Sequence, residues 1–450
     1  MPSRASQCQS RPPRGQNPDR CPGTAPSRYP KRLTGSLAPA ILLIAALWLL
    51  TAGCQTGASH AERRGTGGAD AAGSHPARVP EGSERLPRAS ARGEGPRSLD
   101  RAERRQIEEM LEEMSLRELI GQRFLIYVPG QSVTPDLERI IRTAHPAGFI
   151  LYPWNYETRR GVRQLSSELR DTARRYQPGI DLLLSADQEG GRVAAFRFDS
   201  LVRLPSAHAM GRYENPRFVR SAGYISGVQL RSMGLDMNLA PVLDVYGEAD
   251  STIIGDRSFG GDPETVARLG TAFAEGLRSA GIIAVGKHFP GHGVTTVDSH
   301  GRLPVSRIKP RHLRQRHVLP FKRAVDNGID AIMTAHVLYP RLDSEYPATL
   351  SPYFVGKLLR RRLGFEGVVI SDGVEMGALT EEFSKREILE HALTNGVDLL
   401  LLYARYDLRN VVSVVQQLVA EGRVTRADLR RGVRRVLELK ARYGLLPAIR

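Results

Sequence analysis

A short segment of the sequence, residues 287–300, gathers side chains that are suited to acid–base chemistry. It contains one lysine, three histidines and one aspartate: Lys287, His288, His292, Asp298 and His300. A carboxylate two residues before an imidazole, as in the Asp298–His300 pair, can orient the ring and stabilise its protonated form. Lys287 and His288 are suited to binding a polar substrate. Glycines at positions 291 and 293 allow the loop that carries the pair to move.

Reactive residues recur after other short apolar runs of the chain. They are Asp187, Glu189 and Arg192, then Asp244, Asp256 and Arg257, then His336, and finally Asp372. Each has a purely structural explanation, because an aspartate at the end of a strand often caps the next helix. Arg257 can likewise pair with Asp256 or Asp262, and His336 can be a hydrogen-bonded core residue. The recurrence after five successive runs nevertheless favours one shared site.

Eight apolar runs alternate with amphipathic segments from about residue 101 onward. The runs predicted as strands are 124–128, 148–152, 181–186, 237–243, 282–286, 331–335, 368–371 and 398–402. The segments predicted as helices are 157–176, 215–234, 262–281, 307–328, 351–363, 384–395, 410–421 and 425–442. Apolar runs without polar alternation are typical of parallel strands that are covered on both faces.

Eight strand–helix alternations over about 350 residues predict a closed (β/α)8 barrel in a single catalytic domain, residues 99–450. In such a barrel the residues that follow the strands meet at one mouth, and the two last helices close or brace the barrel. An open doubly wound sheet is the competing fold. It is disfavoured because no Gly-X-Gly-X-X-Gly turn follows a first strand.

Composition and spacing exclude several function classes. The formal net charge is +16, but no lysine–arginine run with interleaved aromatic residues predicts nucleic-acid binding. The three cysteines Cys8, Cys21 and Cys54 all precede the folded region, so we expect neither a disulfide nor a thiolate zinc site there. The histidine spacing matches no helical metal motif, and we expect no metal or other cofactor. The spacing of Asp187 and Glu189 argues against a facing pair of catalytic acids.

The first hundred residues predict export and anchoring. Basic residues precede the apolar run 40–50, and Thr51, Ala52 and Gly53 lead to Cys54, a pattern typical of a signal peptide over residues 1–53. It resembles a bacterial lipoprotein signal, although such signals usually carry leucine where Thr51 stands. The resemblance implies that Cys54 is lipidated and that the protein is a membrane-anchored lipoprotein of the cell envelope, outside the cytoplasm. An uncleaved membrane helix is the alternative, but the run is shorter than the about 20 residues of a span.

Residues 54–98 are rich in Gly, Ala, Ser, Pro and Arg and lack apolar periodicity. Such a segment buries too little surface to offset the entropy of the chain, so it is predicted to be a disordered tether from the lipidated Cys54.

The folded region, residues 101–450, resembles family 3 glycoside hydrolases of the bacterial β-N-acetylhexosaminidase branch. The matching motifs are Asp187–Val193, Gly255–Gly260, Lys287–His300, Met333–His336 and Ile370–Asp372. The resemblance implies a barrel enzyme that retains anomeric configuration. It also implies that Asp372 is the nucleophile and that His300 is the acid/base with Asp298 as its partner. The residues implied to bind the sugar are Asp187, Arg257, Lys287 and His288.

The function implied by the resemblance is that of an exo-β-N-acetylglucosaminidase. It acts through a covalent glycosyl–enzyme intermediate on N-acetylglucosamine-containing glycans or muropeptides from the cell wall, and we expect a monomer. One position departs from the family pattern, because Ala195 stands where a second arginine is common, which leaves the fine specificity open.

Other functions stay open beside the preferred one. A phosphorylase is one alternative, since an imidazole at position 300 repels phosphate less than a carboxylate would. A non-catalytic wall-binding lipoprotein is another. A β-glucosidase is disfavoured, because that branch usually carries a second domain that we do not find.

Overall fold

The computed structural model describes residues 96–246, 253–295, 297–403 and 407–446. The predicted signal peptide, Cys54 and nearly all of the predicted tether lie outside the described residues. All described residues belong to one compact unit.

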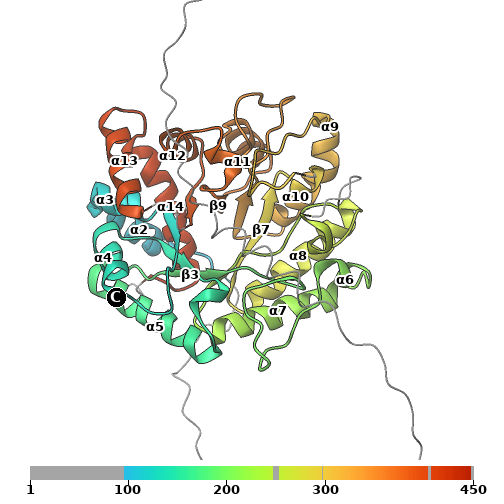
Figure 1. The fold of residues 1–450 in the computed structure, drawn as a ribbon, viewed down its shortest axis with the longest axis horizontal. Coiled ribbons are helices and arrows are strands. Elements are labelled where there is room, and N and C mark those ends of the chain that lie inside the picture. Colours follow the sequence, from blue (N-terminus) through green and yellow to red (C-terminus); the bar gives the residue numbers. More distant parts are fainter. Residues whose placement is uncertain (1–95, 247–252, 296, 404–406, 447–450) are drawn as a thin grey trace, which may run out of the picture. The chain divides into compact units, whose positions relative to one another are not determined.

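Parallel strands form a closed barrel at the centre of this unit (Figure 1). Within the described residues its eight strands are β1 (Phe124–Tyr127), β2 (Gly148–Ile150), β3 (Leu183–Ala186), β6 (Met237–Asn238), β7 (Ile283–Phe289), β8 (Ala331–Thr334), β9 (Val368–Gly373) and β10 (Leu399–Leu402). They are neighbours in this order, and β10 pairs with β1 through Leu125 and Leu401. All eight predicted strands and the (β/α)8 fold are confirmed.

Helices surround the barrel (Figure 1). Their bounds are α2 (Arg101–Glu113), α3 (Leu116–Gly121), α4 (Pro135–Ala144), α5 (Arg159–Tyr176), α6 (Ala207–Gly211), α7 (Pro216–Ser232), α8 (Pro263–Ser279), α9 (Pro310–His312), α10 (Leu319–Asp326), α11 (Gly377–Thr380), α12 (Lys385–Thr394), α13 (Leu408–Ala420) and α14 (Arg426–Arg442). No helix among the described residues is both long and apolar enough to cross a membrane.

Strand residues alternate between two apolar layers. The inward-facing side chains include Leu125, Leu183, Ile283, Ile370 and Leu401, and they form one interior cluster. Outward-facing strand residues pack against the helices in a second cluster. Residues of α14 and its C-terminal end, among them Leu439 and Tyr443, join the interior cluster. The last helix therefore braces the barrel, as predicted.

Three predicted elements differ from the structure, and each of these segments contains a proline. The fourth strand was expected over 237–243, but the regular strand ends at Asn238. Residues 239–241 keep single hydrogen bonds to the neighbouring strands, and Pro241 has no N–H to add another. The helix expected over 307–328 is broken into α9, a π-helical turn η4 (Leu313–His317) and α10, with Pro310 and Pro320 in the first turns of α9 and α10. The segment 351–363 is π-helical over Tyr353–Arg362 (η5).

Candidate active site

The carboxyl ends of the barrel strands bring the predicted site residues to one mouth, because the strands are parallel. Asp187 directly follows β3, Lys287 and His288 are residues of β7, and Asp372 belongs to β9. β7 thus extends three residues beyond the predicted strand 282–286 and includes both Lys287 and His288.

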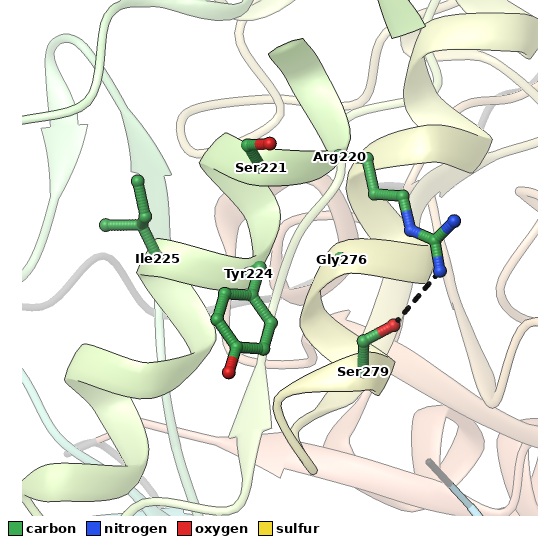
Figure 2. A pocket seen from close by; sticks show the side chains of 6 residues that line it. All are labelled: Arg220, Ser221, Tyr224, Ile225, Gly276 and Ser279. Carbon is green, nitrogen blue, oxygen red and sulfur yellow. Dashed lines mark hydrogen bonds between the residues drawn. The ribbon is translucent and has the colours of Figure 1, made fainter. Parts of the chain in front are cut away.

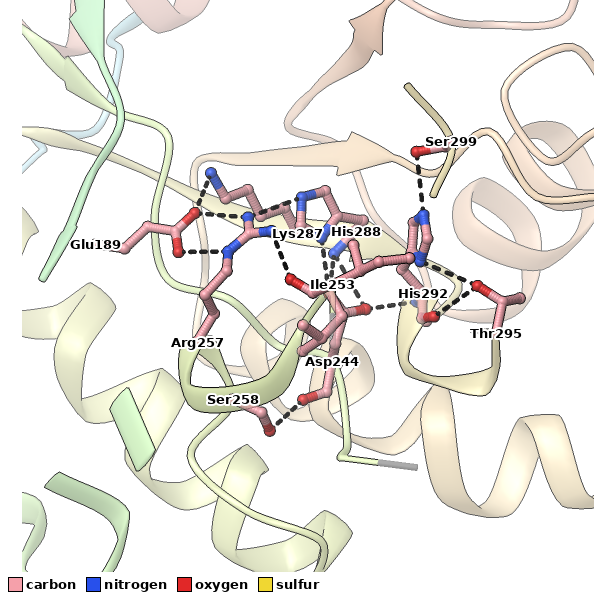
Figure 3. Close-up of polar contacts among 12 residues, drawn as sticks. Glu189, Asp244, Ile253, Arg257, Ser258, Lys287, His288, His292, Thr295 and Ser299 are labelled. Carbon is pink, nitrogen blue, oxygen red and sulfur yellow. Dashed lines mark hydrogen bonds and ion pairs between the residues drawn. The ribbon is translucent and has the colours of Figure 1, made fainter. Parts of the chain in front are cut away.

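Buried charges form a network on one side of this mouth (Figure 3). The Lys287 Nζ lies 2.6 Å from Asp187 Oδ1 and 2.7 Å from Glu189 Oε1. The Arg257 guanidinium donates two hydrogen bonds of 2.8 Å to the two carboxylate oxygens of Glu189. The side chains of Lys287 and Glu189 are only 3% and 5% exposed, whereas that of Asp187 is 29% exposed. Asp187 therefore presents the accessible carboxylate of the network.

The pKa values show how strongly these charges stabilise one another. Burial by itself raises the pKa of the Glu189 carboxyl, but Arg257 and Lys287 outweigh burial and lower that pKa to about 2. Burial likewise lowers the pKa of Lys287, but Asp187 and Glu189 outweigh it and raise that pKa. Glu189 and Lys287 therefore stay ionised at neutral pH, so this donor and this acceptor are fixed before a ligand arrives.

Glu189 was among the reactive residues noted in the sequence, but it is the member of the network to which no role in the site was assigned. Its position results from a hairpin, β4 (Gln188–Gly190) and β5 (Val193–Ala194), which turns at Gly190 and Gly191 with positive φ values of 101° and 56°. The sequence signal for this hairpin is the pair of glycines after Glu189, because paired glycines indicate that the alternation of an extended strand stops there.

Arg257 does not use either of the structural partners considered from the sequence. Asp256 pairs with Arg192 at 2.6 Å instead, and Asp262 caps α8 by accepting a hydrogen bond of 2.8 Å from Thr265 N. Arg257 is therefore held in the site by Glu189.

A fully buried carboxylate, Asp244, fixes one histidine in β7 and another just after it (Figure 3). It accepts hydrogen bonds from His288 Nδ1 at 2.7 Å and from the His292 amide at 2.6 Å. The Nε2 of His288 lies 3.5 Å from Arg257 Nη2. Since arginine is only a donor, His288 accepts through Nε2 and donates through Nδ1 to Asp244. Burial raises the pKa of Asp244, but the interactions with His288 and His292 together outweigh burial and lower that pKa.

Asp372 is a half-buried carboxylate, one residue before the end of β9, and its Oδ1 accepts a hydrogen bond of 2.7 Å from Gly373 N. Burial raises its pKa, but His336 and His288 outweigh burial and lower it. His336 is a satisfied buried histidine that contacts Thr349 Oγ1 at 2.8 Å and the Gly373 carbonyl at 3.0 Å. His336 therefore fixes the Gly373 peptide beside Asp372. The lowered pKa keeps the Asp372 carboxylate ionised at neutral pH.

The Asp298–His300 pair lies on an exposed loop over the same mouth. Nδ1 of His300 lies 2.8 Å from Oδ1 of Asp298, and the two side chains are 71% and 57% exposed. Burial raises the pKa of Asp298, but hydrogen bonds from His300 outweigh it and lower that pKa. His300 is also one of the groups that lower the pKa of Asp372, so the two predicted catalytic groups interact electrostatically.

Main-chain contacts attach this loop to the segment that follows Asp372. The amide of Gly377 donates a hydrogen bond of 3.0 Å to the His300 carbonyl, and Ala378 N donates one of 3.1 Å to the Ser299 carbonyl. The Ser299 hydroxyl also contacts His292 Nε2 at 3.1 Å (Figure 3). The loop is thus held both by the turn η3 (His292–Val294), which follows β7, and by the start of α11.

The fold and these side chains define the class of the protein as a barrel enzyme that binds a polar ligand through fixed charges. No group of three or more histidine, cysteine, aspartate or glutamate residues is arranged to hold a metal ion in the part of the chain that the structure describes. Residues 109–439 match the model of the glycosyl hydrolase family 3 N terminal domain. The chain belongs to this family and is a glycoside hydrolase.

Curated relatives and solved structures support the same family. The Beta-hexosaminidase of Nitrosospira multiformis is 37% identical over 285 residues, 62% of this chain and 79% of that protein. The Beta-hexosaminidase of Methylococcus capsulatus is 40% identical over 265 residues, 57% of this chain and 76% of that protein.

A family 3 beta-N-acetylglucosaminidase structure from Paenibacillus sp. str. FPU-7 matches with a TM-score of 0.72 at 35% identity, and the match covers 75% of this chain but only 64% of that one. The structure of NagZ from Neisseria gonorrhoeae, a complex with N-trifluoroacetyl-D-glucosamine, matches with a TM-score of 0.58 at 29% identity, over 68% of this chain and 87% of that one.

Proposed function

We propose that this glycoside hydrolase is a retaining exo-β-N-acetylglucosaminidase that removes terminal N-acetylglucosamine from cell-wall-derived glycans. The observation that carries the proposal is the ionised Asp372 at the end of β9, with the Asp298–His300 pair attached beside it through α11. The names of the relatives and of the matched structures support the sugar.

In the proposed first step, the Asp372 carboxylate attacks the anomeric carbon of the terminal sugar and forms a glycosyl ester. The bond to the glycosidic oxygen breaks, and that oxygen takes a proton from the His300 imidazolium, so the leaving group departs as a neutral alcohol. Asp298 stabilises the imidazolium before this transfer.

In the second step, His300 is neutral and acts as the base. It takes a proton from a water molecule whose oxygen attacks the same carbon, and the ester bond to Asp372 breaks. Two inversions at that carbon return the β configuration. If phosphate takes the place of water in this step, the product is a sugar 1-phosphate instead of the free sugar. The product therefore distinguishes a phosphorylase from a hydrolase.

The charged network is proposed to bind the sugar. Asp187 accepts hydrogen bonds from sugar hydroxyls, because its carboxylate is the accessible one. Lys287, Arg257 and His288 lie behind Asp187 and are proposed to donate hydrogen bonds to the sugar or to accept them from it. Glu189 is proposed as a positioning residue that keeps the two cations in place.

An aryl β-N-acetylglucosaminide tests the reaction. The wild-type protein should release N-acetylglucosamine, and NMR should show the β-anomer first. Asp372→Ala should lower kcat by several powers of ten, while Asp326→Ala, a surface aspartate paired with Lys322 on α10, should not. Undiminished turnover by Asp372→Ala would rule the mechanism out. Formation of a sugar 1-phosphate in phosphate buffer would instead assign a phosphorylase, and binding without turnover would assign a wall-binding protein.

We also propose that the protein is a monomeric lipoprotein, anchored to a bacterial membrane through Cys54 and facing away from the cytoplasm. The pattern of residues 28–54 supports this proposal. The full chain expressed in a bacterium should fractionate with membranes, and Cys54→Ser should move to the soluble envelope fraction. Equal distribution of the two proteins would contradict the anchor, and light scattering of the detergent-free Cys54→Ser protein measures its oligomeric state.

A further inference from the structure

Aromatic side chains form the side of the mouth above three neighbouring strands, β10, β1 and β2. Tyr127 ends β1, Tyr152 follows β2, and Tyr403 directly follows β10; all three pack, partly buried, against the interior cluster. The ring centroids of Tyr152 and Tyr403 are 5.8 Å apart. Trp154 stacks on Tyr152 with centroids 4.5 Å apart and an interplanar angle of 17°. We refer to these four residues as the aromatic wall.

The inner part of the aromatic wall borders the reacting groups. A side chain at Gly373 would collide with the Tyr403 ring, so this ring lies directly against the residue after Asp372. Burial raises the pKa of the Tyr403 hydroxyl, and the charges of Asp372 and Asp187 raise it further. The same two carboxylates raise the pKa of Tyr152, after burial and the neighbouring Tyr403. Both tyrosines are therefore close enough to interact electrostatically with the proposed nucleophile and with the proposed sugar-binding carboxylate.

The outer part of the aromatic wall is exposed but held in place. Trp154 is 54% exposed, and its ring Nε1 donates to the Val128 carbonyl at 3.4 Å. It belongs to a 3-10 turn, η1 (Pro153–Asn155), whose Asn155 amide donates to the carbonyls of Val128 and Gly130 at 2.8 and 2.7 Å. An exposed aromatic ring that is already immobilised loses little entropy when a ligand stacks on it.

We propose that Trp154 is the subsite for the sugar ring that carries the leaving oxygen. This inference rests on the proposed function, and it assigns the substrate class as a β-linked oligosaccharide of two or more pyranose rings rather than a glycoside of a small alcohol. The wall leads outward from Asp372 through Tyr403 and Tyr152 to Trp154. A pyranose presents C–H groups on its faces, and an aromatic ring binds such a face through apolar contact.

Two substrates separate this role from a general effect on the site. They are methyl β-N-acetylglucosaminide, whose leaving group has no ring, and the β-1,4-linked disaccharide of N-acetylglucosamine. In Trp154→Ala, the ratio of kcat/KM for the disaccharide to kcat/KM for the methyl glycoside should fall about tenfold relative to the wild type. Trp154→Phe, which keeps a ring, should retain most of the ratio.

The matched control is Tyr224→Ala. Tyr224 is also an exposed aromatic residue, at 49%, but it lies outside the barrel on α7, where it lines a surface pocket of about 330 Å³ with residues of α8 (Figure 2). Its removal should leave the ratio unchanged. An unchanged ratio in Trp154→Ala, or an equal loss on both substrates, would overturn the proposal.

Binding measured by fluorescence keeps this inference separate from the proposed reaction. The sequence has two tryptophans, Trp48 and Trp154, so the full chain with Trp48→Phe and Asp372→Ala reports on Trp154 alone and does not consume the disaccharide during the titration. Titration with the disaccharide should change its emission saturably, and the single sugar should do so less. No saturable change would overturn the subsite. A wild-type protein that turns over neither substrate would refute the proposed function, and the titration would still decide whether Trp154 binds sugar.

Discussion

Lys440 provides a stability prediction whose size and pH dependence both follow from the structure. This lysine of α14 is fully buried, and its Nζ donates a hydrogen bond of 2.9 Å to Oε1 of Gln122. Burial lowers the pKa of Lys440 from 10.5 to about 7, although Asp181 and Asp236 oppose the change. The folded protein therefore releases this proton more readily than the unfolded chain does.

The free energy of unfolding of the wild-type protein depends on pH through this group. Between about pH 7 and 10.5 the unfolded chain binds the Lys440 proton and the folded protein does not, so stability rises with pH across this window. Below about pH 7 the full penalty of the buried charge is present. The pKa difference, 10.5 − 7 = 3.5, corresponds to about 5 kcal/mol.

Lys440→Met keeps a side chain of similar length without the charge. At about pH 6 the variant should be about 3–4 kcal/mol more stable than the wild type, because the lost hydrogen bond to Gln122 offsets about 1–2 kcal/mol of the gain. The gain should shrink as the pH rises toward 10.5.

Urea unfolding followed by circular dichroism at about pH 6, 8 and 9.5 measures the difference. Lys322→Met, which removes an exposed lysine of α10, is the control and should change stability by less than about 0.5 kcal/mol. A difference between Lys440→Met and the wild type that is the same at all three pH values would refute the reasoning.

Two further predictions concern the mouth. Glu189→Gln removes the carboxylate that lies between two cations, and it should lower the free energy of unfolding by about 3 kcal/mol near pH 7, since the carboxyl pKa falls from 4.5 to about 2 on folding. In urea titrations this deficit should vanish as the pH falls from 4.5 toward about 2; a constant deficit would contradict the assigned pairing. Gly377→Ala should reduce kcat at least tenfold, because its Cβ would come 2.2 Å from a carbonyl oxygen of the loop that carries His300. Gly130→Ala, where a Cβ meets nothing within 4 Å, is the control, and equal activity of the two variants would show that the loop contact is dispensable.

The barrel was predictable from the sequence because its strands are short apolar runs with helices between them. Each run is buried on both faces, and this requirement leaves a direct trace in residue type. The fourth strand shows the limit of the pattern. Its apolar run continues to Leu243, but Pro241 ends the regular pairing, and Val242 makes only an isolated bridge to Lys287. Hydrophobicity predicts burial, whereas pairing also requires an N–H at each position.

The site was predictable only where it follows the strand ends. Lys287, His288 and Asp372 come directly from that rule. The role of Glu189, which orients Arg257, could not be predicted from that rule. A hairpin returns Glu189 to the mouth, whereas the alternation of an extended strand would point it elsewhere. The buried Asp244 was noted at a strand end, but its bonds to the ring of His288 and the amide of His292 depend on the three-dimensional path of the chain.

The aromatic wall was missed for a different reason. The prediction from strand ends rested on polar and charged side chains alone, yet Tyr127, Tyr152 and Tyr403 occupy the corresponding positions of β1, β2 and β10. The same rule, applied to aromatic residues, would have found them in the sequence.

The exposure of the Asp298–His300 pair determines what keeps it in place while the pocket is empty. Two charges in contact with bulk water attract one another by only about 1 kcal/mol or less, and dissolved salt weakens them further. The main chain that carries His300 is therefore held chiefly by the amides of Gly377 and Ala378, and the contact with Asp298 orients the ring without fixing it strongly. Once a glycan fills the mouth and displaces solvent, the same two side chains interact in a medium of lower polarity, where the carboxylate supports the positive ring far more strongly.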